Sequence, residues 1–359
     1  MRRQALCSIT QRACPIHWPL QLGDAQQGAR FKVTCGDMMS RYDHQRQETE
    51  KRAERERQKP YVETGASIGL NVDIGSGSWI RLGSSITDSV LGDDVFVGFR
   101  SHISNASISH NCLIGSLACI GHGGGARVHV SRAVWIGARA VIEPGVRIGL
   151  GAVIGAGAHI REDVPADVIV VGRPGRVLRK RTVLEDGMPN FHEILGAVRS
   201  RRSANQNGRA PTRERGGLEP EGIMDVDICD GGHMQLGSGI IAIGRANAMT
   251  QEGGIAVGVG IRIGDRAVLE ASGGVTMGDG VKLGCETLIA SSGHDLTRRS
   301  LPWRGCPVSI GSWVEVGHGT TIVGPARIGE RARIMPGSVI VGDVGSGQTS
   351  FGVFGRARR

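Results

Sequence analysis

An aliphatic residue recurs at nearly every sixth position along most of this chain, and glycine usually follows it. The first series runs from Ile68 to Ile160, with two steps of five residues and one short break. The second begins near Ile223 and is clear from Ile263 to Ile340. A period of six fits neither the 3.6-residue turn of an α-helix nor the two-residue alternation of a strand.

A six-residue repeat predicts a solenoid in which each repeat is one short strand followed by a turn. The aliphatic residue points inward, and the small residue behind it lets the backbone bend. Successive coils then pair strand on strand, about 4.8 Å apart. The fold class predicted is all-β, with two parallel β-helices in tandem. Small residues at the fifth place of the repeat would share the interior with the aliphatic residue: Ala140, Val146, Ala152, Ala158, Thr320, Ala326 and Ala332.

The two series divide the chain into four parts. Residues 1–60 form a polar, charged tail with a helical stretch over 45–59 that has no apolar face. Residues 61–180 form the first β-helix module and residues 223–359 the second. Residues 181–222 are interpreted as a flexible basic linker, with a short helix over 191–198.

Composition and charge narrow the classes of function. Glycine supplies 57 of 359 residues and aromatic residues only 4%, which suits narrow, closely stacked coils. The formal net charge is +9, but residues 1–61 and 173–222 each carry +5, so the two modules together are near neutral. This distribution argues against specific nucleic-acid binding.

The cellular location of the protein is predicted from signals that the sequence does not contain. No apolar run approaches the roughly 18 residues of a membrane span, and no apolar stretch follows the basic start at Met1. The eight cysteines form no C-x-x-C pair. These features favour a cytoplasmic protein.

Several segments of the first module carry a family resemblance. The segments are 134–146, 154–157, 163–166 and 170–177. They resemble the late coils and the closing turn of the hexapeptide-repeat acyltransferases, which are left-handed parallel β-helices. In the second module the closing turn is less similar, because Phe354 stands where Pro174 stands in the first.

This resemblance implies a homotrimer that uses acetyl-CoA, held in the groove between neighbouring helices. The pantetheine arm would approach the backbone at glycines of the late coils, and basic residues at the end of the first module would meet the CoA phosphates. The residues implied for cofactor binding are Gly145, Gly155, Gly324, Gly337, Arg173 and Arg176.

The second module is interrupted after Ile289 by His294, Asp295 and a loop that runs to Cys306. This arrangement resembles sugar O-acetyltransferases of the maltose, galactoside and colanic-acid types, in which a histidine at this place is the general base. An imidazole with a pKa near 6.5 can take the proton of a weakly nucleophilic alcohol. The sequence therefore predicts acetyl transfer to a hydroxyl of a sugar or glycan precursor, with Asp295 orienting either the ring or the acceptor.

Three other functions stay open. His110 lies in a motif similar to that of sugar N-acetyltransferases, but Asn111 replaces the acidic residue. His294 and His318 resemble two zinc ligands of γ-class carbonic anhydrases; the third ligand position holds Val323, so no metal is expected. One or both modules could also be a non-catalytic scaffold that only mediates assembly.

The N-terminal tail is predicted to be dispensable. A chain that starts at Lys59 should keep its fold, because residues 1–58 contain no six-residue repeat and no apolar face to bury. Circular dichroism and size-exclusion chromatography of the shortened chain test this. Loss of the folded trimer on shortening would contradict it.

Overall fold

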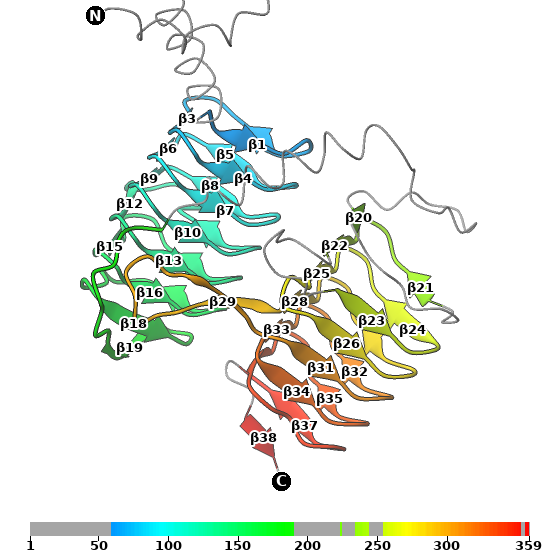
Figure 1. Cartoon of the computed structure of the whole chain (residues 1–359). Coiled ribbons are helices and arrows are strands. Elements are labelled where there is room, and N and C mark those ends of the chain that lie inside the picture. Colours follow the sequence, from blue (N-terminus) through cyan, green and yellow to red (C-terminus); the bar gives the residue numbers. More distant parts are fainter. Residues whose placement is uncertain (1–58, 190–222, 225–233, 244–253, 353–355, 359) are drawn as a thin grey trace, which may run out of the picture. The chain divides into compact units, whose positions relative to one another are not determined.

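The computed structural model describes residues 59–189, 223–224, 234–243, 254–352 and 356–358. All of them belong to one compact unit, Ala53–Arg359. These residues form short strands joined by turns, with no helix among them, and the strands build two stacks of coils (Figure 1). The fold is all-β with two parallel β-helices in tandem, as the repeat predicts, and it is consistent with the left-handed winding that the family resemblance implies. The helices expected over 45–59 and 191–198 fall on residues outside the described ranges, apart from Lys59.

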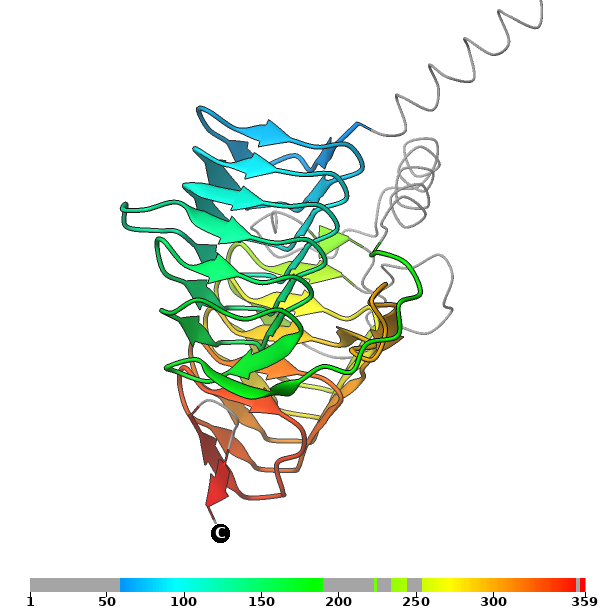
Figure 2. The same cartoon turned by 90° about the vertical axis from the view of Figure 1, so that its left-hand side faces the viewer.

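The first module winds through three parallel sheets, named here 1a, 1b and 1c in chain order, and Figure 2 shows its coils stacked one above another. Sheet 1a contains β1 (Tyr61–Val62), β4 (Trp79–Ile80), β7 (Phe96–Val97), β10 (Leu113–Ile114), β13 (Trp135–Ile136), β16 (Val153–Ile154), β18 (Val168–Val171) and, antiparallel, β19 (Arg176–Lys180). Sheet 1b contains β2 (Ser67–Ile68), β5 (Ser85–Thr87), β8 (His102–Ser104), β11 (Cys119–Ile120), β14 (Val141–Ile142) and β17 (His159–Ile160). Sheet 1c contains β3 (Asp73–Ile74), β6 (Val90–Leu91), β9 (Ala106–Ile108), β12 (Val128–Val130) and β15 (Arg147–Ile148).

The second module repeats this plan in sheets 2a, 2b and 2c. Sheet 2a contains β21 (Met234–Leu236), β24 (Ile261–Ile263), β27 (Lys282–Leu283), β32 (Glu315–Val316), β35 (Arg333–Ile334), β37 (Thr349–Phe351) and, antiparallel, β38 (Arg356–Arg358). Sheet 2b contains β20 (Ile223–Met224), β22 (Ile241–Ile243), β25 (Val268–Glu270), β28 (Leu288–Ala290), β33 (Thr321–Val323) and β36 (Val339–Val341). Sheet 2c contains β23 (Ile255–Val257), β26 (Val275–Met277), β31 (Val308–Ile310) and β34 (Ala326–Ile328).

The repeated aliphatic residues form the interior of each module. In sheet 1a, Ile114 pairs with Val97 on one side and Ile136 on the other, so the same position of each coil stacks on the next. All three are 0% exposed. Burying one such side chain is worth about 1.5–3 kcal/mol relative to exposure. The small residues expected beside them are also buried: Ala140, Val146, Ala152, Ala158, Thr320, Ala326 and Ala332.

Glycine behind the aliphatic residue is required by the stacking itself. A Cβ atom on Gly137 would lie 2.6 Å from the backbone nitrogen of Ala156 in the next coil. On Gly115 it would lie 2.5 Å from the backbone nitrogen of Ala138. Any side chain here would push the coils apart, which explains the high glycine content.

Both modules end in the same way. A short antiparallel strand, β19 or β38, closes the stack after a last parallel pairing on sheet 1c or 2c, at Ile148–Val164 and Ile328–Val344. This shared ending makes sheets 1a and 2a structurally equivalent. Phe354, at the less similar turn, lies outside the described residues.

The equivalent sheets 1a and 2a differ in their outward side chains. The residue before each inward aliphatic residue points outward, because side chains alternate along a strand. On sheet 1a these residues form an apolar ladder: Tyr61, Trp79, Phe96, Leu113, Trp135, Val153 and Ile169. On sheet 2a they form a charged and polar ladder: Arg262, Lys282, Glu315, Arg333 and Thr349.

The two ladders differ in whether they can face water. Glu315 lies 2.9 Å from Lys282 Nζ and 3.6 Å from Arg333 Nε, an exposed arrangement that suits contact with water. The apolar ladder would be costly to leave in water. Another part of the chain must therefore cover sheet 1a.

Candidate active site

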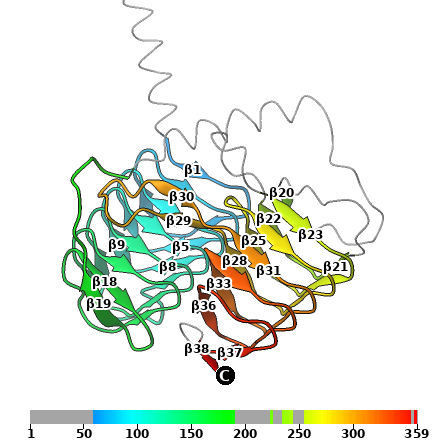
Figure 3. The ribbon, with the colours of Figure 1, turned by 60° about the horizontal axis from the view of Figure 1, so that its bottom comes forward.

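The cover of sheet 1a is a hairpin that leaves the second module after β28 (Figure 3). It consists of β29 (Ser292–His294) and β30 (Trp303–Gly305), which pair antiparallel, with His294 opposite Trp303. At its base the chain passes so close to the next coil that a Cβ on Gly324 would lie 1.8 Å from the carbonyl oxygen of Cys306. The hairpin is the interruption in the repeat that the sequence shows after Ile289.

The hairpin packs on the middle of the apolar ladder. Leu296 and Leu301 lie in one hydrophobic cluster with Phe96, Leu113 and Trp135. Leu301 and Leu113 are only 3% and 2% exposed. The contact buries apolar surface of both modules and places His294 against the first module.

His294 is oriented by a hydrogen bond within the hairpin. Its Nδ1 lies 2.7 Å from the carbonyl oxygen of Leu301. A carbonyl oxygen only accepts, so Nδ1 carries the proton of the neutral ring and donates it. Nε2 then holds the free lone pair, which is the state a general base requires.

The surroundings of His294 favour the neutral imidazole. Burial lowers the pKa of His294 below its ordinary value near 6.5, and the hydrogen bond to Leu301 raises it by a smaller amount. On one side the ring meets the indole of Trp135, with centroids 4.9 Å apart and planes at 78°. This edge-to-face contact restricts the ring and keeps water from that side.

The hairpin tip is held by residues from the end of the first module. Arg299 is 4% exposed and bonds both Asp167, at 2.5 Å, and Glu185, at 2.7 Å. Arg181 donates to the carbonyl oxygens of Leu296 and Arg298 at 3.0 and 3.2 Å. We call Asp167, Arg181, Glu185 and Arg299 the clamp. Residues 181–189 thus hold the hairpin, although the sequence assigns them to the start of the linker.

A polar cluster lies at the foot of the hairpin. Ser292, on the same side of β29 as His294, donates to Glu270 Oε1 at 3.1 Å. Burial raises the pKa of Glu270, and Arg81 of the first module opposes this shift by its charge. Arg81 itself bonds Glu63 at 2.8 Å and stacks on two rings of its own module, those of Trp79 and Phe99.

The structure does not bring Asp295 to the imidazole. Its Oδ1 accepts hydrogen bonds from the backbone N–H and the hydroxyl of Thr297, at 3.0 and 2.7 Å. These bonds hold the pKa of Asp295 below its ordinary range. The partner that orients His294 is the Leu301 carbonyl, which a sequence motif cannot specify.

His110 differs from His294 in its exposure and in the partners of its Nδ1. It is exposed, and its Nδ1 accepts the backbone N–H of Asp93 at 2.9 Å. The same Nδ1 lies 3.3 Å from Oδ2 of Asp93, so a carboxylate stands beside this ring. That acid is not Asn111, whose amide donates to the carbonyl of Pro189 at 2.8 Å.

The glycines expected at the cofactor lie at different corners. Gly155 follows β16 of sheet 1a, and a Cβ there would lie 3.0 Å from Val171, so the protein itself fills the space. The space beside Gly324 is filled in the same way, by the backbone of Cys306. Gly145 and Gly337 occupy turns with φ of +82° and +70°, and Gly337 faces open space.

The basic residues expected at the CoA phosphates are both exposed at the end of the first module. Arg173 Nε donates to the carbonyl of Gly157 at 2.6 Å. Arg176 begins β19. Their position is compatible with an anion, and their contacts with the protein are few.

The described residues hold neither a metal-ligand cluster nor a membrane-spanning helix. Among them, no three His, Cys, Asp or Glu side chains gather as a metal site would require, and His318 is exposed on the second module. No described helix is long and apolar enough to cross a membrane.

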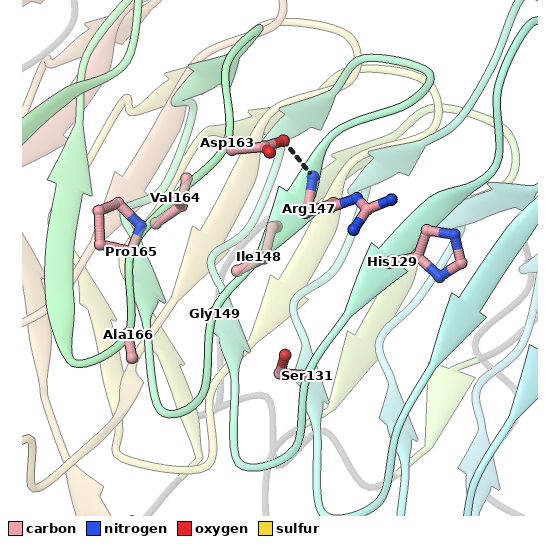
Figure 4. Close-up of a pocket in the computed structure, with 9 residues that line it drawn as sticks. All are labelled: His129, Ser131, Arg147, Ile148, Gly149, Asp163, Val164, Pro165 and Ala166. Carbon is pink, nitrogen blue, oxygen red and sulfur yellow. Dashed lines mark hydrogen bonds between the residues drawn. The ribbon is translucent and has the colours of Figure 1, made fainter.

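Sheet 1c carries an open groove, part of which is drawn in Figure 4. Two adjoining cavities of about 520 and 450 Å³ share His129 and Ser131. Arg147 also lines the larger one, where its backbone N–H donates to Asp163 at 2.8 Å. No hairpin residue lines either cavity, so the groove is separate from His294.

Trp135, Arg299 and Glu270 are site residues that the sequence analysis did not single out. Trp135 had a readable signal, because large apolar residues recur at one outward position of successive coils, at Trp79, Phe96 and Leu113. Such a run indicates a covered face. Arg299 and Glu270 had no comparable signal, since each depends on a contact between segments far apart in the chain.

Family models match repeats in both modules. Residues 127–162 match the bacterial transferase hexapeptide model (six repeats), and residues 253–272 match the hexapeptide repeat of succinyl-transferase. Each module therefore contains repeats of the hexapeptide type. The chain's resemblance to hexapeptide-repeat acetyltransferases is confirmed by its curated relatives.

One such relative is the galactoside O-acetyltransferase of Lactococcus lactis, 33% identical over 116 residues, which are 31% of this chain and 54% of the relative. Another is the 2,3,4,5-tetrahydropyridine-2,6-dicarboxylate N-acetyltransferase of Staphylococcus aureus, 44% identical over 18% of this chain and 26% of the relative. The chain thus spans about half or less of the length of these relatives.

Solved structures that match part of the chain include a GDP-perosamine N-acetyltransferase from Caulobacter crescentus in complex with CoA and GDP-perosamine. It has 24% identity and a TM-score of 0.31, covering 33% of this chain and 56% of the other. An N-acyltransferase from Bacillus cereus in complex with dTDP-4-amino-4,6-dideoxyglucose and coenzyme A has 18% identity and a TM-score of 0.32. That match covers 41% of this chain and 87% of the other.

The clamp predicts how the hairpin responds to loss of Arg299. Arg299→Ala should make the hairpin more sensitive to limited proteolysis, because Asp167 and Glu185 lose their shared partner. Arg299→Lys should protect it only in part, since an ammonium cannot reproduce the two-sided guanidinium contact. Mass spectrometry of early fragments locates the cleavage. Equal cleavage of Arg299→Ala and the unchanged protein would contradict the role of the clamp.

Proposed function

We propose that this protein is an acetyl-CoA-dependent O-acetyltransferase that acts on a hydroxyl of a sugar or glycan precursor, with His294 as the general base. The observation that carries the proposal is the hydrogen bond from Nδ1 to Leu301, which leaves Nε2 free. The likeness to a galactoside O-acetyltransferase supports both the acetyl group and the hydroxyl acceptor.

The reaction follows from this tautomer. Nε2 takes the proton of the acceptor hydroxyl while its oxygen attacks the thioester carbon of acetyl-CoA. The tetrahedral intermediate collapses as the carbon–sulfur bond breaks, and the imidazolium returns the proton to the departing thiolate. The products are the acetyl ester and CoA, with His294 neutral again. Within the expected cofactor set, Arg173 and Arg176 are exposed and Gly337 faces open space, which supports their contact with CoA.

A hydroxyl acceptor needs a general base for its attack on the thioester. An alcohol is a weak nucleophile near neutral pH unless its proton is removed during attack. N-acetylation at His110 is the second candidate function, because the Asp93 carboxylate lies 3.3 Å from its Nδ1. The homotrimer and the cytoplasmic location stay predictions from the sequence.

The two candidate histidines can be compared directly. His294→Ala should lower acetyl transfer by about 10² to 10⁴-fold, the usual effect of a positioned acid–base group. His110→Ala should leave the rate close to that of the unchanged protein. CoA release is measured with one acceptor found by screening sugars, amino sugars and amino acids. If His110→Ala abolishes turnover while His294→Ala retains it, the first module is the active one.

The lowered pKa of His294 predicts the pH dependence. A base works only when it is unprotonated, so the rate should fall only as the pH drops through the folded pKa. Because burial lowers that pKa, the acidic limb of kcat/KM should lie below pH 6.5. A profile from pH 4.5 to 9 measures it. An acidic limb above pH 7 would contradict the assignment.

A further inference from the structure

We infer that the His294 site is completed within a single chain: the first module is its fixed wall, and Trp135 is the residue that positions the base. This inference rests on the proposed function. It assigns different roles to the two modules, with the base on the second and the wall on the first.

Each part of the site occurs once per chain among the described residues. Only the second module has the hairpin. At the corresponding place the first module has the short turn Gly123-Gly124-Gly125. No atom of the protein lies within 4 Å of a Cβ added to Gly123 or Gly124, so this turn is open. Only the first module has an apolar ladder for a hairpin to cover. The equivalent ladder on sheet 2a carries Lys282, Glu315 and Arg333. A hairpin with Leu296 and Leu301 would desolvate these charges, which is unfavourable.

The contact between the modules extends beyond the hairpin. Outward residues of sheet 2b, including Val268 and Leu288, are 0% exposed and pack with Phe99 of the first module. Two arginines of the first module reach carbonyl oxygens of the second: Arg100 bonds Arg266 at 2.6 Å, and Arg139 bonds Glu286. With the clamp, these bonds hold the two modules of one chain together, and the hairpin lies on the apolar ladder of the same chain.

Trp135 acts on the reaction through His294. Its indole lies against the imidazole and contributes to the burial that lowers the histidine pKa. The nearby carboxylates are directed elsewhere, Asp295 to Thr297 and Glu270 to Ser292. Removing the indole should therefore admit water to the ring and bring its pKa back toward 6.5.

Complementation between two impaired variants tests the single-chain site. His294→Ala and Trp135→Ala chains, carrying different tags, are produced in the same cell and purified together. If the site forms within one chain, the pool should show no more acetyl transfer than the two variants measured separately. A site shared between chains would pair an intact His294 with an intact Trp135 and restore activity. Such restoration would overturn the inference.

The positioning role is tested by the pH profile and by the conservative variant. Trp135→Ala should lower kcat and move the acidic limb of kcat/KM to higher pH, and Trp135→Phe should recover part of both. His318→Ala, which removes an exposed imidazole of the second module, should change neither. An unchanged acidic limb in Trp135→Ala would refute the role, even if kcat fell.

A spectroscopic measurement separates this inference from the proposed function. Titration of histidine-labelled protein by nuclear magnetic resonance gives the His294 pKa without an acceptor, and the His294→Ala spectrum assigns its signal. Trp135→Ala should raise this pKa and remove the ring-current shift. If no acceptor is acetylated but these changes occur, only the proposed function fails. If acetyl transfer occurs but the His294 signal is the same in Trp135→Ala, the inference fails.

Discussion

The close approach of successive coils is the constraint on which both modules depend. Parallel strands of only two or three residues gain little from their own hydrogen bonds, so they persist because each coil stacks in register on the next. That stacking needs an aliphatic residue inside and, at the corners where the coils approach most closely, no side chain directly behind it, as Gly115 and Gly137 show. Once the stack exists, its corners are fixed in space. The hairpin that bears His294 starts from one of these corners.

The fold was predictable because its signal is local and repeated. The period of six, the small residues at the fifth place and the closing turn at Pro174 can all be read within a few dozen residues. The two modules and the interruption before His294 were visible in the same way. The helices expected over 45–59 and 191–198 fall almost entirely outside the described residues and stay predictions.

The site was less predictable because its contacts join distant segments. His294 could be named from the break in the repeat, but its partner is a backbone carbonyl, which no residue type encodes. Asp295, the adjacent acid, instead bonds Thr297 within its own turn. The clamp links Asp167 to Arg299 over 132 residues, and only the folded chain brings them together. Gly155 and Gly324 were expected to let CoA approach the backbone closely. In the structure, the atoms that approach these glycines belong to the protein itself.

The different outward faces of sheets 1a and 2a have a consequence for how this protein can vary. In a symmetric oligomer of identical subunits, one substitution appears at every copy of an interface. Here the equivalent positions Trp135 and Glu315 are encoded separately, so each can change without altering the other. Joining the modules in one polypeptide removes the demand for self-complementarity. One half is then free to lose its reactive groups while the other retains them.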